Sequence, residues 1–195
     1  MKRFLYSFSF LLIATVLHSC DKEWPDFKKP SVQLNYKAEW STDLLEFVTP
    51  IVYYTDADGE HETELPASML TMDVPEYTLN GEAVKDDPYF CWSKAVILKT
   101  FNTTNTVIVK YNRNANAQVD NDKTYSFRHR LYLSTAAVTQ NNSIQHYLFS
   151  NPEVTIGEDF YKYHGENATS YIEKLCDTPD SITVAIDENG NITFE

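Results

Sequence analysis

The sequence has little of what marks a catalytic or nucleotide-binding protein. It contains 5 glycines in 195 residues, and none lies in a pattern that could cradle a phosphate. It has no Gly-x-Ser-x-Gly nucleophile elbow, and Cys91 lies in no local catalytic signature. We therefore expect that the protein is not an enzyme. Because 28 acidic residues supply many carboxylate pairs, a small hydrolase without a recognisable motif is kept as an alternative.

Metal-ligand spacing is missing as well. The histidines beyond the N-terminal segment are scattered, without a His-x₃-His or Cys-x₂-Cys pair, so we expect neither a metal nor a cofactor. His129 shares the parity of Phe127 and Leu131, which predicts a hydrogen-bonded core histidine. Residues 56–59 superficially resemble a calcium loop, but their glycine follows only two acidic residues and a strand comes next. A hairpin turn is the better interpretation.

Basic residues are scarce. The chain has 16 Lys and Arg against 28 Asp and Glu, for a net charge of −12. This charge repels phosphate backbones, so we expect no nucleic-acid partner. Beyond the first twenty residues, no apolar run approaches the roughly 18 residues that predict a membrane helix. What the chain does have is 43% apolar and 14% aromatic residues, enough for a packed core.

The first twenty residues have the pattern of an export signal. Lys2 and Arg3 precede an apolar run from Phe4 to Leu17, which is too short to span a bilayer but suits a signal peptide. Ser19 directly before Cys20 resembles the lipobox of bacterial lipoproteins. The resemblance implies cleavage after residue 19 and lipidation of Cys20, which would anchor the protein to a membrane. A soluble export signal with a chance cysteine is the alternative.

The predicted domains follow from this processing: residues 1–19 are a signal peptide, 20–30 the lipidated cysteine and a tether, and 31–195 one domain. Asp21 and Glu23 lie just behind the cysteine, which resembles the surface-export signal of lipoproteins from the Bacteroidota. The resemblance implies an outer-membrane protein, lipid-anchored, on the cell surface rather than on the periplasmic face. The processed chain loses two of its 16 basic residues and none of its 28 acidic ones, so its net charge becomes −14 instead of −12.

Strand patterns dominate from Ser31 onward. Residues 31–40 alternate between polar and apolar without a break, as a half-buried strand does. Residues 45–55 predict a second strand, and Asn80-Gly81 predicts a two-residue hairpin turn. One helix is indicated near the C-terminus, with its buried face formed by residues at i, i+3, i+4, i+7 and i+8: Ala168, Tyr171, Ile172, Leu175 and Cys176. Asn167 is its candidate N-cap, and a hairpin around Asn189-Gly190 follows it. We predict an all-β, mainly antiparallel sandwich of about ten strands with one short C-terminal α-helix; a barrel is left open.

Two local features refine this picture. Residues 122–127 resemble the start of strand F in immunoglobulin and fibronectin type III sandwiches, which implies a tyrosine corner at Tyr125. If Cys20 carries lipid, Cys91 and Cys176 form an even pair that could make a disulfide in an oxidising compartment. Each also lies in an apolar pattern, so two buried free thiols are the alternative.

Two aromatic segments are candidates for ligand recognition. Asp86 and Asp87 precede Tyr89, Phe90 and Trp92, and we expect them in a loop at the rim of the sandwich. Tyr161 and Tyr163 lie in a second segment before the helix. Aromatic rings stack on sugar C–H groups, and carboxylates bind sugar hydroxyls, so both segments suit a carbohydrate. The alternative is that these rings cover the ends of the core, with Trp92 the first to be buried.

The sequence therefore predicts a cellular location more clearly than an activity. Surface lipoproteins of the kind it resembles commonly serve adhesion or glycan recognition, which makes a non-enzymatic binding module with a glycan or protein ligand our first hypothesis. A structural or assembly subunit, fimbria-like and pairing strands with a partner, is the second.

Overall fold

The structure is a computed structural model that describes residues 31–85, 87–98, 101–138, 153–188 and 191–195. The alternating segment forms strand β1 (Ser31–Ser41), as predicted. It pairs antiparallel on one side with β7 (Tyr89–Leu98) and on the other with β9 (Thr124–Val138). Because both edges of β1 are hydrogen-bonded, the strand lies inside its sheet and not at an edge.

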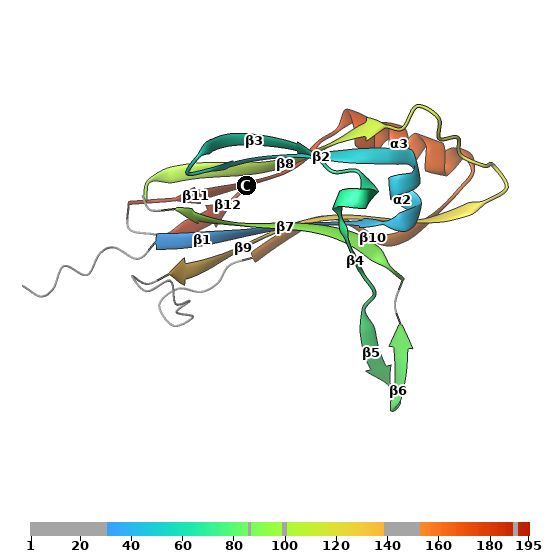
Figure 1. Ribbon diagram of the computed structural model, residues 1–195, viewed down its shortest axis with the longest axis horizontal. Coiled ribbons are helices and arrows are strands. Elements are labelled where there is room, and N and C mark those ends of the chain that lie inside the picture. Colours follow the sequence, from blue (N-terminus) through green and yellow to red (C-terminus); the bar gives the residue numbers. More distant parts are fainter. Residues whose placement is uncertain (1–30, 86, 99–100, 139–152, 189–190) are drawn as a thin grey trace, which may run out of the picture. The chain divides into compact units, whose positions relative to one another are not determined.

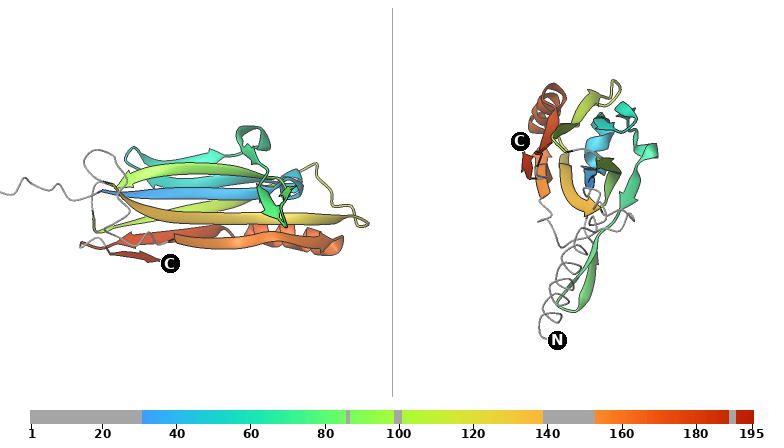
Figure 2. Two further views of the ribbon diagram at one scale, coloured as in Figure 1. Left: turned by 90° about the horizontal axis from the view of Figure 1, so that it is seen from below. Right: turned by 90° about the vertical axis from the view of Figure 1, so that its left-hand side faces the viewer.

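Two five-stranded sheets pack face to face, as Figures 1 and 2 show. The first sheet has the order β10-β9-β1-β7-β4, with β10 (Glu153–His164) and the short β4 (Thr71–Asp73) at its edges. The second sheet has the order β12-β11-β8-β2-β3, formed by Ile192–Phe194, Asp180–Ile186, Thr103–Arg113, Val48–Asp56 and Gly59–Glu64. The predicted all-β, mainly antiparallel sandwich is confirmed, with 12 strands among the described residues instead of about ten.

The core lies between the sheets and is filled by alternate residues of the facing strands. Leu34, Trp40 and Phe127 of the first sheet are fully buried, as are Val107 and Val184 of the second. The Trp40 indole N–H donates to the Tyr111 hydroxyl over 3.2 Å, and that hydroxyl donates to Asp180 over 3.0 Å. Polar atoms brought into the core by large rings are thus paired, which avoids the cost of burying them alone.

The predicted C-terminal helix is confirmed as α3 (Glu166–Asp177), with Ala168, Tyr171, Ile172 and Leu175 buried. Its N-cap is Gly165 and not Asn167. Gly165 has φ +50°, and a Cβ there would lie 2.8 Å from the Asn121 carbonyl oxygen, so a side chain does not fit.

A second helix, α2 (Thr42–Phe47), includes the first residues of the segment 45–55, which was predicted to be a strand. The Ser41 hydroxyl accepts the Leu44 N–H over 3.3 Å, which starts a helical turn and lets Leu44 and Phe47 reach the core. Both helices thus begin at positions that the apolar pattern alone did not identify.

Two of the predicted turns are present, whereas Asn189-Gly190 lies outside the described residues. Asp56 pairs with Gly59 across a two-residue turn, so residues 56–59 form a hairpin, as predicted. Asn80 and Gly81 have φ of 52° and 86°, both positive as a type I′ turn requires. The Tyr125 hydroxyl accepts the Asp120 N–H over 2.9 Å, which is the kind of contact that a tyrosine corner makes.

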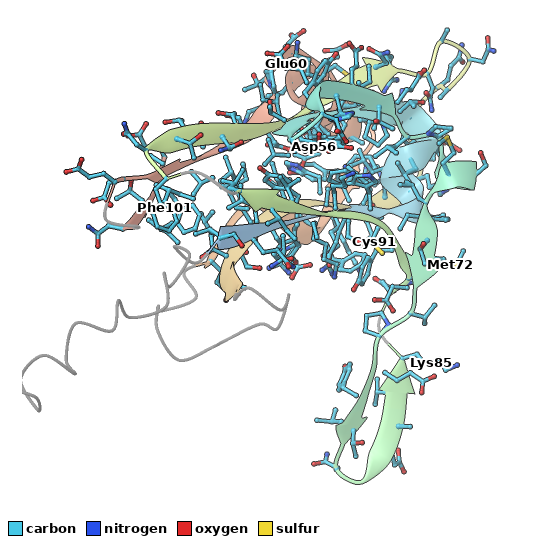
Figure 3. The ribbon with its side chains drawn as sticks, turned by 60° about the vertical axis from the view of Figure 1, so that its left-hand side comes forward. Asp56, Glu60, Met72, Lys85, Cys91 and Phe101 are labelled. Carbon is cyan, nitrogen blue, oxygen red and sulfur yellow. The ribbon has the colours of Figure 1, made fainter. Side chains whose placement is uncertain are left out.

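The hairpin of β5 (Glu76–Leu79) and β6 (Glu82–Lys85) is a separate two-stranded sheet that extends from the first sheet (Figures 1 and 3). A short 3₁₀ helix, η1 (Ala67–Met69), and β4 lead into it. Most large hydrophobic side chains that are exposed in the described structure lie along this stretch: Met69, Met72, Val74, Tyr77 and Leu79.

Candidate functional site: a tyrosine-lined pocket beside α3

The first predicted recognition segment is not a rim loop. Asp86 lies outside the described residues, and Asp87 is exposed. Tyr89 begins strand β7 and is only 6% exposed, because the Arg128 guanidinium covers its ring at 4.3 Å. Its hydroxyl donates to Asp73 of β4 over 2.8 Å. Tyr89 is therefore not available as a sugar platform, and Tyr89→Ala should act on stability.

Phe90 and Trp92 follow on the same strand and are partly buried. Phe90 pairs with Trp40 of β1 and so shares the inward face. The Trp92 ring packs against Tyr54 of the opposite sheet, with 5.7 Å between ring centroids. The prediction that Trp92 belongs with the core agrees with this contact, and no side chain of this segment lines the pocket described next.

Tyr161 and Tyr163 lie in strand β10 and not in a loop. The register with β9 shifts between Glu158 and Tyr161, where β10 bulges. Before the bulge even-numbered residues face inward with Ile156, and after it odd-numbered Tyr161 and Tyr163 oppose Phe127 and Tyr125. The bulge thus turns both tyrosines toward α3.

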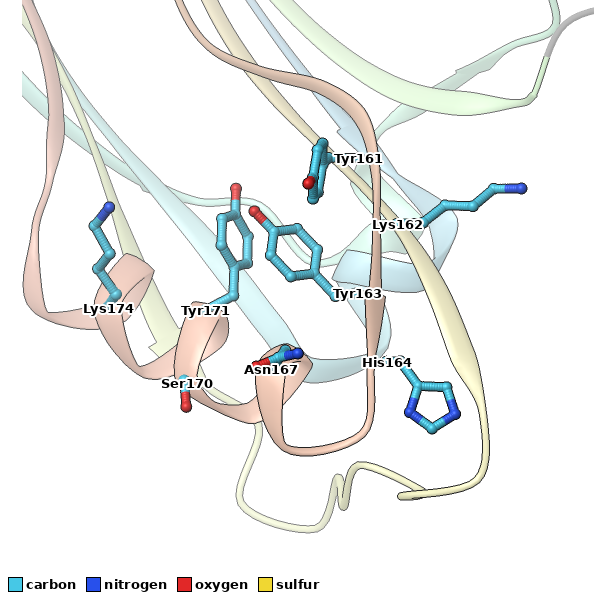
Figure 4. A pocket seen from close by; sticks show the side chains of 8 residues that line it. All are labelled: Tyr161, Lys162, Tyr163, His164, Asn167, Ser170, Tyr171 and Lys174. Carbon is cyan, nitrogen blue, oxygen red and sulfur yellow. The ribbon is translucent and has the colours of Figure 1, made fainter.

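These tyrosines line a pocket of about 510 Å³ between the end of β10 and α3. Helix α3 contributes side chains at i, i+3, i+4 and i+7, which is a single helical face. Figure 4 shows the three tyrosine hydroxyls directed toward a common region, with Lys174 on the helix side and Lys162 on the strand side. The lining residues are Tyr161, Lys162, Tyr163, His164, Asn167, Ser170, Tyr171 and Lys174.

A continuous series of aromatic contacts connects the pocket to the core. Tyr161 lies 5.1 Å from Tyr163, and Tyr163 lies 4.3 Å from Tyr171, measured between ring centroids. Tyr171 lies 5.6 Å from the fully buried Phe127. We call these four rings the tyrosine ladder. Because each ring rests on the next, the 61% exposed Tyr161 is supported by the core although it lies at an edge strand.

Two of the pocket tyrosines, Tyr163 and Tyr171, are held in their neutral form. Burial, followed by the hydrogen bond from its hydroxyl to Glu158 over 2.6 Å, raises the pKa of Tyr163 well above the usual range. Burial also raises the pKa of Tyr171, with the Glu158 carboxylate adding to the effect. The Tyr171 hydroxyl oxygen is itself buried, close enough to the Glu158 carboxylate for that charge to raise its pKa.

Sequence reasoning identified Tyr161 and Tyr163 but assigned Tyr171 to the core. Tyr171 is 9% exposed and satisfies both descriptions, because its ring packs on Phe127 and the residue also lines the pocket. Asn167, Ser170 and Lys174 were missed. Their spacing from Tyr171 along the helix was the available signal.

Cys91 and Cys176 are both free, so of the two alternatives left open by the sequence the structure has the free thiols and not the disulfide. Cys91 pairs with Glu39 on the outer face of the first sheet, whereas Cys176 packs partly against the core from α3. Figure 3 shows Cys91 near the base of the β5–β6 hairpin. Burial raises the pKa of both thiols, which keeps them protonated and weakly nucleophilic.

A buried ionic cluster lies on the outer face of the first sheet, and the sequence did not indicate it. Glu39 is 2% exposed there and accepts hydrogen bonds from Arg128 and from the Tyr132 hydroxyl, the latter over 2.8 Å. Lys37 binds its other oxygen at 2.5 Å. Burial alone would raise the pKa of Glu39, but these partners hold it below its usual value. A groove of about 420 Å³ lies beside this cluster.

His129 is buried and its Nδ1 lies 2.8 Å from an Asp180 oxygen, so the predicted core histidine is present. In the part of the chain that the structure describes, no group of three or more His, Cys, Asp or Glu side chains is placed to hold a metal ion.

Comparisons with protein-family models, with curated proteins and with solved structures found no match to this chain. Within the described ranges, no helix is long and apolar enough to cross a membrane. The function is therefore inferred from the pocket geometry and the sequence.

Proposed function

We propose that the protein is a lipid-anchored binding module of the cell envelope that recognises a carbohydrate in the pocket beside α3, without catalysing a reaction. The observation that carries this proposal is Tyr161. Its ring is 61% exposed, yet it stands at the outer end of a ladder that continues to buried Phe127. An exposed ring at a loose edge would be a poor platform, whereas a supported ring loses little freedom when a ligand stacks on it.

The polar groups around the ladder suit the hydroxyls of a sugar. Asn167 and Ser170 offer both donors and acceptors from one helical face. A pocket that combines aromatic faces with a few placed polar groups is the usual form of a small-ligand site. Its volume of about 510 Å³ accommodates one or two sugar rings.

The cellular address in this proposal comes from the sequence. The positive residues, the short apolar run and Ser19 before Cys20 support a lipid anchor. The acidic residues behind Cys20 support export to the outer face of an outer membrane, as in the lipoproteins of the Bacteroidota that the segment resembles. A glycan-binding module held at that surface fits adhesion or glycan capture.

The second candidate, an assembly subunit, is favoured by the β5–β6 hairpin. Tyr77, Leu79 and Val84 share one face of this two-stranded sheet, because Tyr77 pairs with Val84 and the strand alternates. A two-stranded hairpin with an uncovered apolar face is only marginally stable alone, which favours a partner. A sedimentation coefficient that rises with concentration, and no longer does so in Leu79→Ser, would favour assembly.

The test of the first candidate is the variant Tyr161→Ala in the full-length protein, purified in detergent and assayed on a broad glycan panel. We expect loss of glycan binding with a melting temperature close to wild type, because the side chain is mostly exposed. Tyr77→Ala is the matched control: Tyr77 is 49% exposed but lies in the hairpin, so binding should be unchanged. Binding that survives Tyr161→Ala, or wild-type protein that binds no glycan, would contradict the proposal.

A further inference from the structure

The charge of the pocket is opposite to that of the chain. The whole sequence carries a net charge of −12. Among the described residues that line the pocket, two are lysines, one is a histidine and none is acidic. Because the protein has nearly twice as many acidic as basic residues, a random patch of its surface would be expected to include acidic side chains.

Helix α3 separates its charges by face. Its pocket side carries Asn167, Ser170, Tyr171 and Lys174. Its carboxylates, Glu166, Glu173 and Asp177, recur at spacings of seven and four residues and are not among the lining residues. Of the nearest acidic residues of β10, Asp159 pairs with Arg128 and Arg130. Glu158 is not a lining residue, but its carboxylate accepts the hydroxyl of the lining residue Tyr163.

Resting on the proposed function, we propose that the ligand of this pocket is an acidic carbohydrate, one that carries a carboxylate or a sulfate. Tyr161 stacks on the sugar ring, and Lys174 pairs with the acidic group.

The position of Lys174 fits this role, because it lies on α3 beside the tyrosines (Figure 4). Lys162 extends from β10 toward the side away from the tyrosines (Figure 4). A lysine has a long flexible stem and a compact ammonium group, so it can follow an acidic substituent without fixed geometry. We expect Lys174 to contribute more than Lys162, because it shares the helical face of Tyr171.

The experiment compares matched pairs of probes that differ only in charge. The pairs are an oligogalacturonate and its methyl ester, sialyllactose and lactose, and galactose 6-sulfate and galactose. Affinities of the full-length protein in detergent are measured by titration calorimetry at low and high salt. We expect an acidic member to bind more tightly than its neutral partner, with an affinity that falls as salt rises.

The decisive variant is Lys174→Gln, which should weaken binding of the acidic member about fivefold, as expected for one partly exposed ion pair, and leave the neutral member unaffected. Lys85→Gln, in the β5–β6 hairpin, makes the same change in net charge and should alter neither affinity. If the acidic and neutral members bind with equal affinity, and this binding is lost in Tyr161→Ala, the inference of an acidic ligand is overturned and the proposed function stays intact. No binding of any probe would overturn both.

Discussion

Glu39 shows how a single residue can hold a charge where the strand pattern predicts a solvated side chain. It lies on the outer face of the first sheet, yet it is 2% exposed because Arg128, Lys37 and Tyr132 converge on it. Arg128 is buried as well, and its Nε has no hydrogen-bond partner. The charges stabilise each other only as a set, because removing one member leaves another buried and unpaired.

Replacing Glu39 should therefore cost stability, and the cost should depend on pH. Glu39→Gln is expected to lower the free energy of unfolding by about 3 kcal/mol at pH 7. Because hydrogen bonds hold the folded pKa of Glu39 below the usual 4.5, its contribution is complete above pH 4.5 and disappears as the pH falls through the folded value. The difference between wild type and variant should thus shrink in acid.

Urea denaturation from pH 7 to pH 3 measures this difference. Glu60→Gln is the control, since Glu60 is an exposed glutamate on β3, and its effect should stay within about 0.5 kcal/mol at every pH. A difference between wild type and Glu39→Gln that is constant over this range would contradict the role assigned to the carboxylate.

At the scale of elements, strand β10 determines whether the candidate site exists. Its bulge reverses which residues face α3, and Gly157 lies just before the register shift. Gly157 has φ +102°, and a Cβ there would lie 2.1 Å from the His129 carbonyl oxygen. A side chain at this position cannot be accommodated unless the two strands move apart.

We expect Gly157→Ala to destabilise the fold and to weaken glycan binding, because it disturbs the segment that presents Tyr161. Gly59→Ala is a matched control: Gly59 also has positive φ, at +121°, but no atom lies within 4 Å of the position that a Cβ would take there. Both variants carry backbone strain, and Gly157→Ala should cost about 1–3 kcal/mol more through overpacking. Equal melting temperatures for the two variants would argue against the close approach of β10 and β9.

The same strand shows what the sequence could and could not predict. Alternation in residues 31–40 predicted β1, and the apolar spacing around Tyr171 predicted α3, because each pattern continues without a break. Tyr161 and Tyr163 were identified by composition, but the face that they share was not. A bulge reverses which residues of a strand face inward, and no sequence signal marks it as clearly as Asn-Gly marks a hairpin turn. Tyr89 was assigned to a loop because Asp86 to Pro88 has turn composition, although the strand begins directly after it.

Long-range partners were the other limit. Nothing near Glu39 in the sequence indicates Arg128, which is 89 positions away. The two cysteines are also separated by tertiary structure: Cys91 lies on the outer face of the first sheet, whereas Cys176 packs against the core from α3. Local periodicity predicts helices and strands. Whether an outward-facing side chain is buried depends instead on the side chains of the neighbouring strands.

For the whole molecule, the acidic surface and the proposed anchor act together. A net charge of −14 after processing disfavours binding to anionic lipid surfaces, so retention at a membrane would depend on the acyl chains at Cys20. The membrane association of this protein can therefore be tested at one residue.

Cys20→Ala should release the protein from the membrane fraction or leave it as an unprocessed precursor. Fractionation followed by mass measurement distinguishes these forms from the mature lipoprotein, and Cys91→Ala serves as the control that removes a cysteine without touching the anchor. A Cys20→Ala protein of normal mature size that stays with the membrane would refute lipidation. Protease treatment of intact cells then tests the surface location, because a periplasmic protein would survive while a known surface marker is removed.

The central position of β1 has a mechanical consequence. Ser31, where the tether ends, pairs with Val138 at one end of β9, whereas Tyr163 of the pocket pairs with Tyr125 near the other end. A pull between an anchored N-terminus and a captured ligand would thus run along the strands of the first sheet. Interstrand hydrogen bonds are perpendicular to antiparallel strands, so those on both sides of β1 would share the load in shear and would not open one after another. Such loading suits a domain that must hold a ligand under flow.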